Sequence, residues 1–323
     1  MVKELTRPTA PLRRGAASDT AVAFFNGEFV PLRDAKVSVL THALNYGTGV
    51  FEGVRAYWNA DQKQLYGLHL AEHYRRIHQS CRIMRLEIPF TPERLIEITL
   101  ELLRRNEFRE DTYVRPLAFA SDEIIGVRLH DLHTAFTMIA VPFGTYVDIE
   151  SGISCGVSSW RRVDDNAIPA RAKITGSYVN AALAKTEAQE AGYDEAIVLT
   201  SDGHVSEGSA ENLFIVRDGT LITPPATDNI LEGIVRQSVM RIAADQKIPV
   251  QVRSIDRTEL YVCDELFLTG TGAQLAPVTS VDHRAVGDGK IGSITKQLST
   301  LYFSAVHGNE ERYKGWVTPV YTT

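Results

Sequence analysis

The sequence predicts an α+β fold, with a small N-terminal α/β sandwich domain and a larger C-terminal domain that carries a barrel-like β-sheet. Hairpin-forming dipeptides recur at Asn26-Gly27 and at the Asp-Gly pairs 202–203, 218–219 and 288–289, so much of the sheet should be antiparallel. An apolar strand gives way to a polar, turn-rich stretch at Phe143–Thr145. We therefore expect a disordered arm over 1–20, a small domain over 21–143, a linker over 144–149 and the large domain over 150–323.

The first half shows a hairpin, then alternating strands and helices. Two apolar runs flank Asn26-Gly27, and residues 41–57 suit a strand and loop near a ligand. Residues 69–84 have helical periodicity. A second helix should start at Pro92 after the N-cap Thr91. Residues 112–121 and 134–142 are typical of strands.

The second half alternates short strands with a few helices. An alanine-rich helix is expected over 178–191, because Gly192 is a common C-terminal stop. Another helix is expected over 231–247.

Composition limits the classes of function. The chain has 323 residues, 44% hydrophobic and 23% charged, which is ordinary for a globular enzyme. A net charge of −6 argues against nucleic acid or an anionic membrane as the main partner. The three cysteines and the histidines (His42, His69, His73 and His78) have no metal-ligand spacing, so we expect reduced thiols, no metal and a cytoplasmic protein. The basic N-terminus has no apolar core and does not resemble a secretory signal.

Two segments carry the chemistry: IPARAKITGSY at 168–178 and VSEGSAENLF at 205–214. The first holds a single lysine, Lys173, among small and apolar neighbours, and the second holds Glu207 and Glu211 in an apolar context. A lysine that loses its proton and a carboxylate that stays charged are what a pyridoxal phosphate enzyme needs. From the residues alone, a lysine between Ala172 and Ile174 is more often an exposed surface residue than a buried functional one. If both glutamates lie on one strand they share a face, and either could be the functional carboxylate.

These segments resemble the class IV aminotransferases, the fold-type IV pyridoxal phosphate enzymes, and most of all the branched-chain amino acid aminotransferases. The resemblance extends from about Phe24 to Tyr302. Its further motifs, in order, are FFNGEFVPLRDAKVSVLTHALNYGTGVFEGVRAY from Phe24, YVRPL from Tyr113, VSSW from Val157, LEGIVR from Leu231 and TGTGAQLAPV from Thr269.

The resemblance implies a cofactor site in the large domain. Lys173 would form the Schiff base, Tyr178 would bind the ring phenolate oxygen and Glu207 would pair with the pyridine nitrogen. Glu211 would have a supporting role. The phosphate would be held by Arg76, Gly233, Ile234, Val235 and Thr271. Val235 and Ser177 depart from the pattern, because the family commonly has threonine and asparagine there.

The resemblance also implies a substrate site. Tyr113, with the backbone of Gly272 and Ala273, would hold the α-carboxylate. Arg115 would hold the side-chain carboxylate of glutamate, supported by Arg55. The apolar pocket would be lined by Tyr46, Phe51, Val127 and Trp160. Arg128 stands where the family usually has proline after asparagine, and it could offer an alternative carboxylate site.

The expected activity is transfer of the amino group of leucine, isoleucine or valine to 2-oxoglutarate by a ping-pong mechanism, in a homodimer or larger homo-oligomer. Alternatives on the same fold are a D-amino acid or (R)-amine aminotransferase and aminodeoxychorismate lyase. A non-catalytic binding protein would be expected to lack Lys173 or Glu207, and both are present.

Overall fold

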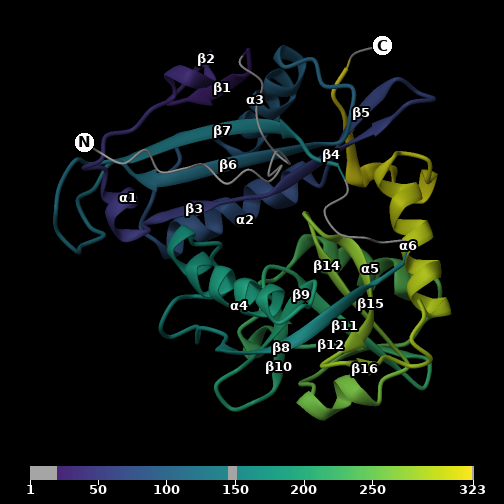
Figure 1. Ribbon diagram of the computed structural model, residues 1–323. Helices are drawn as coiled ribbons and strands as arrows, with labels where there is room; N and C mark the ends of the chain where they lie inside the picture. The colour runs from purple at the N-terminus through teal and green to yellow at the C-terminus, as the bar shows by residue number, and fades with distance from the viewer. Residues whose placement is uncertain (1–19, 145–150, 322–323) are drawn as a thin grey trace, which may run out of the picture.

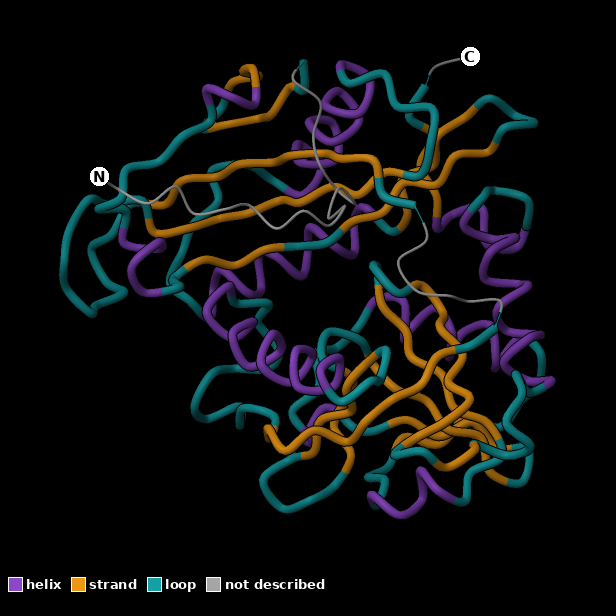
Figure 2. The backbone as a smooth tube through the Cα atoms, in the orientation of Figure 1, coloured by secondary structure: helices purple, strands orange, loops and turns teal. Residues whose placement is uncertain are grey.

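The computed structural model of the protein describes residues 20–144 and 151–321. Two β-sheets with helices on their faces make up the described chain (Figure 1). The tube view shows the second sheet strongly curved, below the flatter first sheet (Figure 2). The mixture of separate sheets and packed helices confirms the α+β prediction.

The first sheet has the strand order β17-β5-β4-β6-β7-β1-β2, and β3 pairs with β6. Every pairing in it is antiparallel. Its strands are β1 (Val22–Phe25), β2 (Glu28–Pro31), β3 (Gly49–Phe51), β4 (Val54–Asn59), β5 (Gln64–Leu68), β6 (Thr112–Ala120), β7 (Thr134–Pro142) and β17 (Val317–Pro319). Because Phe25 pairs with Glu28, Asn26-Gly27 forms the predicted two-residue hairpin turn.

Two helices pack on the first sheet and form its core. α2 (Leu70–Ile83) and α3 (Pro92–Arg105) bury apolar side chains against the strands. The Thr91 side chain accepts a hydrogen bond from the Arg94 N–H, so the predicted N-cap of α3 is confirmed. Residues 42–46, expected in a strand and loop, instead form the short helix α1 (His42–Tyr46), which ends at Gly47 with a φ of 66°.

The second sheet has the strand order β10-β9-β8-β15-β14-β11-β12-β13, and β16 pairs with β15. The pairs β8/β9, β8/β15 and β12/β13 are parallel, and the others are antiparallel. Its strands are β8 (Ile153–Arg161), β9 (Glu195–Leu199), β10 (Val205–Gly208), β11 (Asn212–Arg217), β12 (Thr220–Thr223), β13 (Val250–Val252), β14 (Glu265–Gly270), β15 (Gln274–Val281) and β16 (Arg284–Ala285).

Three helices pack near the second sheet. α4 (Tyr178–Glu190) connects β8 to β9, α5 (Ile234–Asp245) connects β12 to β13, and α6 (Ser293–Val306) leads from β16 back to β17 of the first sheet. Short 3₁₀ turns are η1 (Leu32–Asp34), η2 (Thr175–Ser177), η3 (Ala226–Asp228), η4 (Arg257–Tyr261) and η5 (Glu311–Trp316). Gly192 follows α4 with a φ of 87°, as the sequence predicts for a helix stop.

Three further local expectations were wrong. Asp288-Gly289 is not a hairpin turn, because β15 turns back into β16 at Asp282-His283, where both residues have a positive φ. Glu207 and Glu211 do not share a strand, since β10 ends at Gly208 and Glu211 lies in the turn before β11. Helix α5 starts at Ile234 rather than Leu231, because the Leu231 carbonyl accepts a hydrogen bond from the Asn212 side chain.

The division into domains at 143–150 stays a prediction. Residues 1–19 of the expected arm and residues 145–149 of the expected linker lie outside the residues that the structure describes. The chain returns to the first sheet after the second is complete, because β17 pairs with β5. Within the described residues no helix is both long and apolar enough to cross a membrane.

Candidate active site

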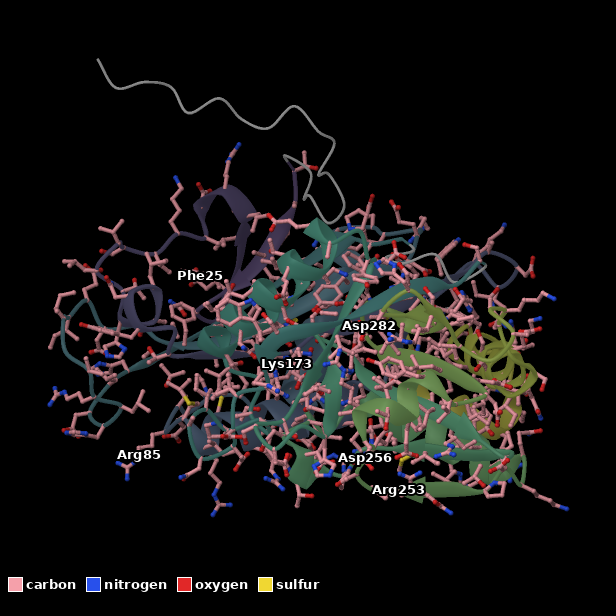
Figure 3. All side chains as sticks on the ribbon, turned by 60° about the horizontal axis from the view of Figure 1, so that its bottom comes forward. Phe25, Arg85, Lys173, Arg253, Asp256 and Asp282 are labelled. Atoms are coloured by element: carbon pink, nitrogen blue, oxygen red, sulfur yellow. The ribbon has the colours of Figure 1, made fainter. Side chains whose placement is uncertain are left out.

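Two adjoining cavities lie between the sheets. The first is lined from α2, the Lys173 segment, β10 and the start of α5, and it includes Arg76, Lys173, Tyr178, Glu207, Gly233, Ile234, Val235 and Thr271. All eight residues predicted to bind the cofactor therefore border one cavity. Lys173, Tyr178 and Thr271 also line the second cavity, so they stand between the two. In Figure 3, Lys173 is labelled near the middle of the molecule.

The backbone of Lys173 is held by the first sheet and α2. The Phe51 N–H donates to the Lys173 carbonyl at 3.0 Å, and the Lys173 N–H donates to Ser80 Oγ at 3.3 Å. Burial of the amine, followed by the nearby positive charge of Arg76, lowers the pKa of Lys173 to about 8. A substantial fraction of this amine is therefore neutral near physiological pH, as an attacking amine or a base must be.

Glu207 lies at the floor of the first cavity, almost fully buried. Its Oε1 contacts Nη2 of Arg162 at 2.9 Å. Its Oε2 accepts hydrogen bonds from Asn212 Nδ2 at 2.9 Å and from the Leu231 N–H at 3.1 Å. Burial raises the pKa of Glu207, and Arg162 acts against that rise by stabilising the anion.

The opposite end of the cavity is suited to an anion. The first N–H in the hydrogen-bond ladder of α5 is that of Gln237, which donates to Gly233 O at 3.1 Å, so the preceding N–H groups face the helix N-terminus. A Cβ on Gly233 would lie 1.9 Å from Asn212 Oδ1, so only glycine fits there. Arg76 lies beside this turn, since its Nη1 donates to Glu232 O at 2.9 Å.

Arg76 is fixed by a buried carboxylate. Its Nε and Nη2 donate to the two oxygens of Glu52, each at 2.7 Å, and His73 Nδ1 lies 2.8 Å from Glu52 Oε2. Glu52 is fully buried, and the Arg76 guanidinium holds the pKa of that carboxyl well below its usual range, against the effect of burial. This fork orients the cation at the anion-binding end of the cavity.

The second cavity combines apolar side chains with an arginine. Its lining includes Phe51, Ile139, Val141, Phe143, Tyr113, Arg115 and Gly272. Arg115 Nη2 donates to the Tyr113 hydroxyl at 2.8 Å, while its buried Nε has no partner in the described structure. An unpartnered buried guanidinium N–H beside a cavity favours an anionic ligand.

Arg55 and Ala273 lie behind this cavity rather than in its wall. Both are buried, and Arg55 Nη1 donates to Gly272 O at 3.2 Å, which ties the Gly272 turn to β4.

Four of the predicted substrate residues do not reach either cavity within this single chain: Tyr46, Val127, Arg128 and Trp160. Val127 is 87% exposed and Trp160 is 43% exposed. Arg128 lies 4.0 Å from Asp131 on the surface.

Sequence reasoning missed Glu52, Asn212 and Arg162, each of which contacts a predicted site residue. Glu52 stood out in the sequence as a single carboxylate in the run Val50–Val54.

Glu211, considered as a rival to Glu207, borders the second cavity. Burial, together with the nearby negative charge of Glu195, raises the pKa of Glu211 to about 8. Among the described residues no three His, Cys, Asp or Glu side chains group as metal ligands do.

A lysine of lowered pKa, a buried carboxylate and a helix N-terminus suited to an anion lie around one cavity, and together they favour a pyridoxal phosphate enzyme. The sequence model of the family described as "Amino-transferase class IV" matches residues 49–281. The chain therefore belongs to this family.

Its relatives indicate the group within the family. A "probable branched-chain-amino-acid aminotransferase" from Aquifex aeolicus is 50% identical, over 93% of this chain and 96% of the relative. The crystal structure of the branched-chain aminotransferase of Thermoproteus uzoniensis with norvaline superposes with a TM-score of 0.90 at 44% identity, covering 93% of this chain and 99% of that one.

A further similar structure carries the cofactor. The crystal structure of the branched-chain amino acid aminotransferase from Thermobaculum terrenum in its PLP-form, the holo-form, has a TM-score of 0.90 at 35% identity, over 94% of this chain and 99% of that one. These relatives are branched-chain aminotransferases by their names, and each is similar to this chain over more than nine-tenths of its length.

Proposed function

We propose that this enzyme transfers the amino group of leucine, isoleucine or valine to 2-oxoglutarate, with both substrates using the second cavity in turn. The observation that carries this proposal is the make-up of that cavity, in which Phe51, Ile139 and Val141 lie beside the Tyr113–Arg115 pair. The apolar side chains suit a branched aliphatic group, and the guanidinium suits the second carboxylate of glutamate.

The first cavity fits pyridoxal phosphate at three points. The N–H groups that begin α5, together with Arg76 and Thr271, suit its phosphate. Glu207 suits its ring nitrogen, and Tyr178 its ring hydroxyl. The buried Thr269 hydroxyl has no partner in the described structure and also borders this cavity, as expected of a group that awaits a ligand.

When bound, pyridoxal phosphate joins the substrate nitrogen through its aldehyde and withdraws electrons from the substrate α-carbon through its ring. Lys173 would take the proton from that α-carbon with its neutral Nζ and deliver it to the cofactor carbon C4′ within the first half-reaction, and the second half-reaction would run the same transfer in reverse. The Glu207 carboxylate holds positive charge at the ring nitrogen. Tyr113 and the Gly272 turn hold the α-carboxylate, and Arg115 holds the γ-carboxylate of glutamate.

We also propose a cytoplasmic homodimer. Large apolar side chains are exposed on two neighbouring segments of the first half, at Val37, Val39, Leu40, Leu44, Ile124, Ile125 and Val127. Exposed apolar patches of this kind often mark interfaces, and a second copy would cover them. The loop that carries Val127 and Arg128 would then contribute to the pocket of the partner copy. A protein of monomer mass in solution at micromolar concentration would contradict this assembly.

The activity is tested by an amino-donor panel of leucine, isoleucine, valine, an (R)-amine and a D-amino acid, each with 2-oxoglutarate and with pyruvate. We expect the three branched L-amino acids with 2-oxoglutarate to be fastest. Faster turnover of a D-amino acid or an (R)-amine would overturn the proposed specificity. Borohydride reduction followed by peptide mapping should find the cofactor attached to Lys173.

A further inference from the structure

The carboxylate of Glu207 is in direct contact with a cation that no sequence motif identified. Arg162 Nη2 lies 2.9 Å from Glu207 Oε1, and the two side chains are only 12% and 5% exposed. The other carboxylate oxygen, Oε2, is held by Asn212 and by the Leu231 N–H. The carboxylate therefore meets one charged donor and two neutral donors before any ligand binds.

Arg162 is itself fixed in place. Its N–H donates to Leu199 O at 2.8 Å, and its Nε donates to Asn229 O at 3.0 Å. Asn229 has a φ of 59°, and its side chain contacts the segment that leads to Lys173, through the Asp165 N–H at 3.2 Å and Asp164 Oδ1 at 3.0 Å. Arg162 thus links the Glu207 carboxylate to the backbone around Asn229.

Two other cations lie near Glu207, and neither replaces Arg162. Arg236 is already engaged, because its Nε donates to Thr223 Oγ1 and its Nη2 to Pro224 O. Lys173 acts as a base only after it has lost its positive charge. A guanidinium keeps its charge over the whole physiological pH range, so Arg162 is the permanent cation in contact with this carboxylate.

We propose that Arg162 is a positioning residue that keeps Glu207 anionic and fixed in orientation, so that the proton shared by Glu207 and the cofactor ring stays on the ring nitrogen. The inference rests on the proposed role of Glu207. The proton has two possible sites, the ring nitrogen and the carboxylate oxygen, and no other bond changes. Because Arg162 contacts the carboxylate directly, its removal increases the affinity of the carboxylate oxygen for that proton.

The test uses holoenzyme reconstituted with pyridoxal phosphate labelled with ¹⁵N in the ring, since the ¹⁵N chemical shift reports whether the nitrogen carries a proton. The variants are Arg162→Met and Arg162→Lys. Arg161→Met is the matched control, because it removes the same charge from the adjacent residue, whose side chain is exposed. The affinity of each cofactor-free protein for pyridoxal phosphate is measured in parallel.

We expect a protonated ring nitrogen at pH 7 in the wild type and in Arg161→Met. In Arg162→Met the shift should move toward the unprotonated value and the affinity should fall about tenfold to a hundredfold. Arg162→Lys should lie between these and serves alone if Arg162→Met does not fold. Wild-type shifts in both Arg162 variants would overturn the role of Arg162. An unprotonated nitrogen in the wild type would instead overturn the proposed pairing of Glu207.

Discussion

Replacing Glu52 with glutamine tests whether the phosphate-binding arginine depends on its buried partner. The substitution removes a negative charge that accepts from Arg76 Nε and Nη2, each at 2.7 Å. Arg76 is also buried, so its charge would remain largely out of water without a counterion. The pKa of Glu52 is held well below its usual range, so the carboxylate contributes its full stabilisation at neutral pH, and that contribution is lost only as the pH falls into the acid range.

Breaking a buried ion pair by removing one partner typically costs about 3–5 kcal/mol. A glutamine at position 52 still offers one amide oxygen to Arg76, so we expect about 3 kcal/mol in the free energy of unfolding of the cofactor-free protein. Saturating pyridoxal phosphate should reduce the loss, because its phosphate supplies Arg76 with a new anion. Urea unfolding at pH 7, with and without cofactor, measures both quantities.

Glu72→Gln provides the control on α2, the helix that carries Arg76. Glu72 pairs with Arg75 at 3.0 Å and lies 3.6 Å from His69 Nδ1, but the Glu72 and Arg75 side chains are 39% and 64% exposed, so its loss should cost less than about 1 kcal/mol. A cost for Glu52→Gln as small as that for Glu72→Gln would show that Arg76 does not depend on Glu52. A loss at Glu52 that saturating cofactor leaves unchanged would show that the phosphate does not replace the missing anion.

Four further substitutions separate the roles in the site. Lys173→Ala should abolish transamination while circular dichroism stays that of the wild type, and turnover of L-leucine near the wild-type rate would contradict the assigned base. Glu207→Gln should lower kcat by about a hundredfold or more with a smaller change in cofactor affinity, whereas an unchanged kcat would move the role to another carboxylate. Arg115→Leu should weaken glutamate and 2-oxoglutarate by about 1.5–3 kcal/mol in kcat/KM and leave leucine nearly unaffected, and equal losses would assign Arg115 to the α-carboxylate. Arg128→Asn tests the alternative carboxylate site: the wild type should convert an (R)-arylalkylamine and the variant should not, and equal rates would make Arg128 a surface charge.

Features set by a few neighbouring residues could be predicted from the sequence. Thr91 and Pro92 define the start of α3 because a cap and a fixed φ act within one helical turn. Asn26-Gly27 defines a hairpin because the two residues alone set the turn. Asp288-Gly289 has the same local signal, but the turn of β15 into β16 already lies at Asp282-His283.

The ion pairs around the site could not be predicted in this way. Glu52, between β3 and β4, meets Arg76 of α2, and Arg162, just after β8, meets Glu207 of β10, only because the whole fold brings these segments together. The eight predicted cofactor residues line one cavity. The motifs therefore indicated which residues line this cavity, but they held no information on what holds those residues in place. Tyr46, Val127, Arg128 and Trp160 line neither cavity of the single chain, so their predicted roles depend on the proposed second copy.

The return of the chain to the first sheet affects the order in which this protein can assemble on the ribosome. β17 pairs with β5, and the buried Val320 donates its N–H to Leu65 O at 2.9 Å. Gln64 and Tyr321, which exchange hydrogen bonds beside this pair, are 257 residues apart in the sequence. The open edge of β5 therefore stays without this partner strand until the segment that contains β17 has been synthesised. Throughout that interval the nascent first sheet offers a strand edge on which chaperones or other nascent chains can pair.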